Sequence, residues 1–345
     1  MTATATISRA DARDLLVELV ETPSVSGNEA DCAERLAAFL EARDREVRID
    51  EVGNVRAPGS SVLLTSHIDT VSGEIPVELD DGVLRGRGSV DAKGPLSAMA
   101  VAAVETGASF VGVVGEEEGS RGARHLVTDR EEPNYVVNGE PSGWNGLTLG
   151  YRGFQSGTYS VTVESQHTSR PESNAIQHAV GWLSRVESAF DSDGSTVESV
   201  TAKPVEFTGG VTADGLATEA AVDIELRVPP GASAAEVREA AEAELDAGSV
   251  SWNDPIPPTM ASPRTELARA FRVAVRNEGG DPRLLRKTGT SDANLYAEAW
   301  DCPVVTYGPG DSSFDHTPDE RIELAEFDRS ISVLTDVYES LEVDA

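Results

Sequence analysis

The chain has 345 residues, of which 39% are hydrophobic, and this is enough for one large domain or two ordinary domains. Its 60 acidic residues against 28 basic ones give a formal net charge of -32, which argues against binding to nucleic acid or an anionic membrane, because both are polyanions. Two cysteines far apart in sequence, no apolar run near ~18 residues and no signal-peptide pattern predict a cytoplasmic protein without a disulfide framework.

Most of the chain has the pattern of a parallel α/β sheet. Helical periodicity covers residues 9–21 and 27–43, and Asp11, followed by Asp14, is the predicted start signal of the first helix. Short continuous apolar runs then alternate with helical stretches, which is typical of strands buried on both faces of a mostly parallel sheet. The expected strands are 62–66, 110–114, 135–137 and 304–307, and the expected helices are 95–105, 122–127 and 263–277.

The middle of the chain, residues 151–257, has a different pattern. Polar and apolar residues alternate there as in half-exposed strands, and helical stretches separate the alternating segments. The expected strands are 158–164 and 220–228, and the expected helices are 174–190 and 234–245. We therefore predict an inserted α+β domain at 151–257, within an α/β domain made of residues 1–150 and 258–345.

Side chains that bind metals or move protons follow the ends of the predicted strands. They are His67, Asp69, the run Glu116-Glu117-Glu118, Glu140 and His316, with Asp91 in a glycine-rich segment. Because ligands of open α/β sheets bind at the carboxyl ends of the strands, we expect these side chains to meet. Two imidazoles with several carboxylates suit zinc, cobalt or manganese, and a pair of such ions is typical of hydrolytic sites. A remaining carboxylate can then act as general base and acid.

The chain resembles the M20 metallopeptidase family in five segments, 66–70, 86–94, 115–120, 139–141 and 315–317. That family includes acetylornithine deacetylase, aminoacylase and succinyl-diaminopimelate desuccinylase. The resemblance implies an α/β, zinc-peptidase-like catalytic domain with an inserted ferredoxin-like dimerisation domain. It also implies an amide hydrolase with two divalent ions, zinc in the first place and cobalt or manganese as alternatives.

The same resemblance assigns the metal ligands one by one. It implies that His67 and Glu140 hold one ion, that Glu117 and His316 hold the other, and that Asp91 bridges both. Family members also carry a cis peptide bond after the bridging aspartate, so we expect one after Asp91.

Which residue acts as general base depends on how the run Glu116-Glu117-Glu118 aligns with the family. Aligned on the following Gly-Ser pair, the resemblance makes Glu116 the base, Glu117 a ligand and Glu118 an exposed neighbour, with Asp69 orienting the imidazole of the first metal ligand. A second register remains open, in which the base and the ligand both move one residue along the chain.

Residues in and around the insert imply contacts with substrate and with a second subunit. His167 lies in a segment like the one that, in a homodimer of this family, reaches the partner's active site and stabilises the oxyanion. Substrate contacts are implied for Arg152, Arg227, Thr290 and Ser291. An arginine suits a substrate carboxylate because its planar fork grips both oxygens.

Two further segments, 287–294 and 307–312, look most like the family members that cut lysine or ornithine from the carrier protein LysW in lysine and arginine biosynthesis. In those enzymes the amide joins the amino acid to the γ-carboxyl of the carrier's C-terminal glutamate. A small-molecule deacylase acting on acetylornithine, acetyllysine or succinyl-diaminopimelate is the alternative. A binding protein without catalysis is disfavoured, because every ligand type and Glu116 are retained.

The charge itself leads to a first prediction. Acidic residues are interleaved with regular apolar positions, so we interpret the charge of -32 as a halophilic host's solubility device and not as disorder. Because salt screens the repulsion between like charges, we expect the melting temperature to rise between dilute buffer and molar salt. Thermal unfolding followed by circular dichroism in both solutions tests this, and an unchanged or lower melting temperature in salt would contradict it.

Overall fold

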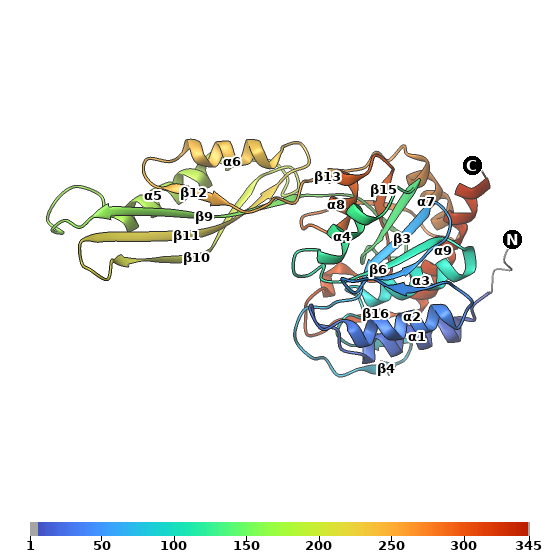
Figure 1. Ribbon diagram of the computed structural model, residues 1–345. Coiled ribbons are helices and arrows are strands. Elements are labelled where there is room, and N and C mark those ends of the chain that lie inside the picture. Colours follow the sequence, from blue (N-terminus) through green and yellow to red (C-terminus); the bar gives the residue numbers. More distant parts are fainter. Residues whose placement is uncertain (1–5, 344–345) are drawn as a thin grey trace. The chain divides into compact units, whose positions relative to one another are not determined.

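The computed structural model describes residues 6–343, of which Val343 is placed by its backbone alone (Figure 1). The chain forms two compact units. The first contains the residues up to Leu149, 261–285 and the residues from Ser291 onward, and the second contains 150–260 and 286–290. The short segment 286–290 belongs to the second unit, although the sequence places it in the α/β domain.

The first unit is built on a mixed sheet with a parallel centre. Neighbouring strands follow the order β1-β2-β6-β3-β7-β15-β8-β13, and β14 pairs with β8; β13 and the last residues of β8 and β14 belong to the second unit. The pairs β6/β3, β3/β7 and β7/β15 are parallel, and the outer pairs for which a register is defined are antiparallel. The strands are β1 (Arg48–Ile49), β2 (Val55–Ala57), β3 (Val62–His67), β6 (Ser109–Val113), β7 (Tyr135–Gly139), β8 (Gly146–Tyr151), β13 (Thr259–Met260), β14 (Arg283–Lys287) and β15 (Val304–Thr306). The predicted α/β class is confirmed.

Helices cover this sheet. Helix α3 (Lys93–Thr106) packs on the central strands, and α1 (Arg9–Glu21) and α9 (Leu324–Val343) pack on α3 in turn, so α3 is buried nearly all round. The remaining helices are α2 (Ala30–Glu41), α4 (Arg121–Asp129), α7 (Glu266–Asn277) and α8 (Asp292–Ala299). Helix α1 begins one residue after Ser8, whose hydroxyl caps the N–H of Asp11, so the predicted start signal lies inside the first turn.

A small sheet ties two distant segments of the first unit together. Strands β4 (Glu78–Asp80), β5 (Val83–Arg85) and β16 (Arg321–Glu323) pair in the order β16-β5-β4. Arg321 lies opposite Arg85 in the antiparallel β16/β5 register. A short 3-10 helix, Ser312–Phe314, precedes this pairing on the C-terminal side. Among residues 6–343, no helix combines the length and the apolar character needed to cross a membrane.

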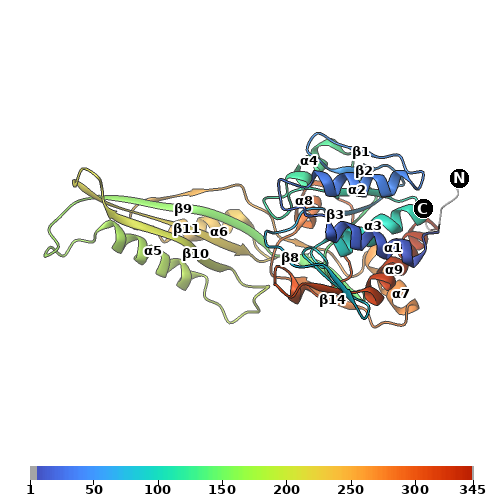
Figure 2. The same ribbon diagram turned by 90° about the horizontal axis from the view of Figure 1, so that it is seen from below.

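The second unit has the β-α-β-β-α-β order of a ferredoxin-like fold (Figure 2). Its antiparallel sheet has the strand order β10-β11-β9-β12. Both helices contact this sheet and each other, and the core includes Tyr159 stacked on Trp182 with ring centroids 4.5 Å apart. The elements are β9 (Gly153–Glu164), α5 (Ala175–Ala189), β10 (Thr201–Val211), β11 (Ala217–Val228), α6 (Ala234–Ala243) and β12 (Ser249–Trp252). The predicted ferredoxin-like insert is therefore present.

Candidate metal centre

The carboxylate of Asp91 lies between two imidazoles in the first unit. One of its oxygens is 3.2 Å from Nε2 of His67, and the other is 3.0 Å from Nε2 of His316. Oε1 of Glu117 lies 3.0 Å from the same His316 nitrogen, and Oε2 of Glu140 lies 3.8 Å from Nε2 of His67. The five side chains that the sequence assigns as metal ligands are thus linked by short contacts, although they come from five separate segments.

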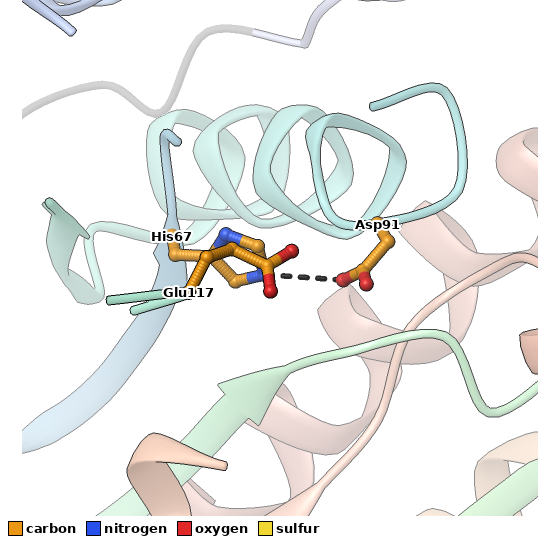
Figure 3. A group of neighbouring side chains, drawn as sticks. All are labelled: His67, Asp91 and Glu117. Carbon is orange, nitrogen blue, oxygen red and sulfur yellow. Dashed lines mark hydrogen bonds and ion pairs between the residues drawn. The ribbon is translucent and has the colours of Figure 1, made fainter. Parts of the chain in front are cut away.

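Three of these residues could hold a single ion. One ligand atom each from His67, Asp91 and Glu117 lies within 4.8 Å of the others. Figure 3 shows the three side chains converging from the end of strand β3, the start of helix α3 and the turn after β6. The peptide bond between Asp91 and Ala92 is cis, as predicted.

His316 is held in an unusual backbone conformation. Its φ angle of 61° lies in the left-handed region, which costs a residue with a side chain about 1–3 kcal/mol. Its imidazole is half exposed, and hydrogen bonds with Asp91 and Glu117 raise its pKa to about 10. The surrounding structure therefore holds this imidazole beside two carboxylates, an environment that favours positive charge.

Asp69 contacts both the His67 imidazole and the turn that carries the glutamates. Nδ1 of His67 lies 2.9 Å from the backbone carbonyl oxygen of Asp69 and 3.6 Å from its carboxylate. The carboxylate instead accepts the backbone N–H groups of Glu116 and Glu117, both at 3.1 Å, and the hydroxyl of Ser26 at 2.7 Å. Burial alone would raise the pKa of Asp69, but the His67 imidazole and these donors lower it to about 2. Asp69 therefore positions the glutamate turn as well as the histidine.

The hydrogen bond to Asp69 also sets which nitrogen of His67 can bind a metal. A carbonyl oxygen can only accept, so Nδ1 carries the proton and Nε2 of neutral His67 presents a lone pair to the Asp91 carboxylate. Two acceptors 3.2 Å apart repel each other unless a cation or a proton lies near them. This arrangement fits a divalent metal ion.

The charge balance of the cluster supports the same fit. Burial raises the pKa of Glu116 well above its usual range, and the nearby Glu140 carboxylate raises it further. Burial would raise the pKa of Asp91, but the His316 and His67 imidazoles beside it lower it. Two imidazoles thus face a surplus of buried carboxylates, and divalent cations would compensate that negative charge.

Within the glutamate run, the three side chains have different surroundings. Glu117 contacts His316, and Glu116 is partly buried near Glu140, whereas Glu118 is exposed. The contact of Glu117 with His316 supports the first of the two registers, which stays a prediction.

Two acidic residues at this edge of the sheet had no predicted role. Asp292 is buried at the first turn of α8, and burial raises its pKa to about 6. Glu320 is buried beside the segment that carries Asp91. Asp292 follows the predicted substrate residues Thr290 and Ser291 directly, so its position could have drawn attention to it. Nothing in the local sequence distinguishes Glu320 from a surface glutamate.

The predicted substrate residues have mainly structural contacts. Arg152 is buried and donates hydrogen bonds to the carbonyl oxygens of Thr288 and Thr196 and to the hydroxyl of Thr201, so these donors are already used within the second unit. Ser291 caps helix α8 through the N–H of Ala293 and a capping box with Asn294. Nε and Nη1 of Arg152 thus hold together segments of the second unit, and its contact with substrate stays a prediction.

Three further predicted residues lie in the second unit. His167 is exposed, with Nδ1 2.9 Å from the hydroxyl of Ser169. The guanidinium of Arg227 lies over the ring of Phe154, 4.7 Å from its centroid. Thr290 is partly buried in the segment 286–290.

Known proteins resemble this chain in sequence and in fold. A relative named LysW-lysine hydrolase, from Deinococcus radiodurans, is 39% identical over 94% of this chain and 95% of its own. Aminopeptidase PepT from Bacillus cereus has the same fold, with a TM-score of 0.80 at 21% identity over 98% of this chain and 100% of that one. The Bacillus subtilis protein YxeP, described as a dinuclear metal binding peptidase, superposes with a TM-score of 0.74 at 12% identity over 97% and 98%. The sequence profile of peptidase family M20/M25/M40 matches residues 63–340, and the chain belongs to that family.

Proposed function

We propose that the protein is a two-metal amide hydrolase that releases lysine, ornithine or both from the γ-carboxyl of the C-terminal glutamate of LysW. The main support for the proposed reaction is the position of the Asp91 carboxylate. One of its oxygens lies near the imidazole of His67 and the other near the imidazole of His316. The substrate rests on the 39% identical relative named for LysW-lysine, which matches this chain over nearly its whole length.

Each side chain of the cluster has a proposed task. Two divalent ions, zinc or else cobalt or manganese, would be held by His67, Asp91, Glu117, Glu140 and His316. When bound, they supply electrophilic polarisation of the amide carbonyl and activation of water. Glu116 takes a proton from the attacking water and passes it to the leaving amine. Its raised pKa suits this task, because a carboxylate shielded from solvent accepts a proton more readily than an exposed one.

The inserted domain, residues 151–257, is proposed to form the dimer contact and to cover the substrate. The catalytic domain is proposed to consist of residues 1–150 and 258–345. In that homodimer, His167 of the partner subunit would stabilise the oxyanion, and substrate would be contacted by Arg152, Arg227, Thr290 and Ser291. Exposed apolar side chains support such a contact. They lie on the edge strand β10 and on helix α5, at Val205, Phe207, Val211, Ile176 and Val180.

A direct comparison of substrates tests the proposal. At high salt we expect release of lysine from LysW with a kcat/KM at least about tenfold above that for Nα-acetyl-lysine, Nα-acetylornithine or succinyl-diaminopimelate, because contacts with the carrier are lost in the small amides. Free amino acid would be quantified by mass spectrometry, and LysW without an attached amino acid is the blank. Hydrolysis of the small amides alone would establish the deacylase alternative.

A further inference from the structure

A buried glutamate outside the ligand set holds the segment that carries Asp91. Glu320 is only 1% exposed, and its Oε1 accepts the backbone N–H groups of Val90 at 3.0 Å and of Asp91 at 3.1 Å. Its other oxygen lies 2.8 Å from Nη1 of Arg87. Backbone N–H groups without a partner are costly in a protein interior, so this carboxylate strongly favours one position of the peptide groups on both sides of Val90.

The position of Glu320 in the chain connects two ligands. It follows His316 by four residues, and its backbone carbonyl accepts the N–H of Gly86 at 3.3 Å. The next residue, Arg321, pairs with Arg85 in the β16/β5 ladder. The segment that supplies one imidazole is therefore attached by side chain and by backbone to the segment that supplies the carboxylate.

Arg87 extends the attachment to a third segment. Its Nε donates to the carbonyl oxygen of Gly73 at 3.0 Å, while Nη1 reaches Glu320. Nη1 also lies 3.4 Å from the carbonyl oxygen of Thr317, next to His316. The guanidinium thus holds Glu320 in place from the side opposite the Asp91 backbone.

We propose that Glu320 is a positioning residue for the metal pair, which sets the distance between the Asp91 carboxylate and the His316 imidazole. The inference rests on the proposed function, because it takes Asp91 and His316 as ligands. Two ions that share one carboxylate need that carboxylate in a narrow range of positions, and residues that orient ligands contribute strongly to metal affinity. No role was predicted for Glu320 from the sequence.

Variants at position 320 separate positioning from general stability. Glu320→Ala removes the acceptor of both N–H groups, and Glu320→Gln keeps an acceptor oxygen at the same reach but loses the charge beside Arg87. Glu323→Ala is the matched control, since Glu323 is exposed on the adjoining strand β16. Each purified protein would be stripped of metal and titrated with Co²⁺ by calorimetry and visible absorption, with kcat and KM measured after metal loading.

We expect Co²⁺ to bind Glu320→Ala about 10–100-fold more weakly than wild type, with an altered visible spectrum and a lower kcat at an unchanged KM. Glu320→Gln should restore most of the affinity, and Glu323→Ala should match wild type. Wild-type Co²⁺ affinity and spectrum in Glu320→Ala would overturn the proposal. If that variant does not fold, Glu320→Asp retains the charge but shortens the reach, and wild-type Co²⁺ binding by it would overturn the proposal equally. Failure of wild type itself to bind Co²⁺ would instead refute the metal centre.

Discussion

Replacing Glu116 by glutamine is expected to lower kcat by about 10²–10⁴-fold while the protein keeps both metal ions. Glutamine has nearly the same shape as glutamate, but its amide cannot take a proton from water and return it to an amine. The turn that carries residue 116 should stay in place, because the Asp69 carboxylate holds it through backbone N–H groups, which the substitution leaves intact. Single-turnover and steady-state assays, with metal content from elemental analysis, measure both quantities.

The neighbouring glutamates provide matched controls and distinguish the two registers. Glu117→Gln should lose metal as well as activity, since Glu117 contacts His316. Glu118→Gln should behave as wild type, because Glu118 is exposed. A Glu116→Gln protein with wild-type kcat would refute the assignment of the base. Metal loss in Glu118→Gln, with metal retained in Glu117→Gln, would establish the shifted register.

Replacing Asp91 by alanine is expected to remove both metal ions and to abolish turnover. The reason is geometric, because one oxygen of Asp91 lies 3.2 Å from Nε2 of His67 and the other lies 3.0 Å from Nε2 of His316. A ligand that binds only the native state raises the melting temperature. Added Zn²⁺ should therefore stabilise the wild-type protein and have no such effect on Asp91→Ala.

The control for this variant is Asp80→Ala, which removes an exposed carboxylate from strand β4 nearby in the chain. It should bind two ions per chain and respond to Zn²⁺ as wild type does. If Asp91→Ala still binds two ions with unchanged affinity, then Asp91 does not bridge the pair. If Asp91→Ala retains one ion, then His67 or His316 can hold that ion without the Asp91 carboxylate.

The order of strands and helices could be predicted because local periodicity reports it. The runs 62–66 and 135–137 are continuous and apolar, and they became strands β3 and β7, buried on both faces of the parallel core. Residues that can bind a metal follow such strands directly. We predicted that they meet, because the carboxyl ends of parallel strands lie at the same edge of the sheet. His67 and Glu140 accordingly lie in one cluster.

Local patterns gave no warning of other features. Helix α9 was not predicted. Strand β10 was also missed, because its side chains are exposed almost throughout and do not alternate between buried and exposed positions. Nε and Nη1 of Arg152 donate to the carbonyl oxygens of Thr288 and Thr196. These partners lie far from Arg152 in sequence, beyond what a window of neighbouring residues can report.

By itself, the sequence determined the α/β class, the insertion of a second domain, the residues that we propose as ligands and the family resemblance. Periodicity and residue type carry that information, and both are properties of short segments. Only the tertiary structure decided that the Asp69 carbonyl sets the tautomer of His67 and that Glu320 holds the backbone of Asp91. Hydrogen-bond partners of buried groups depend on which segments meet in space, and folding alone brings residue 320 to residue 91.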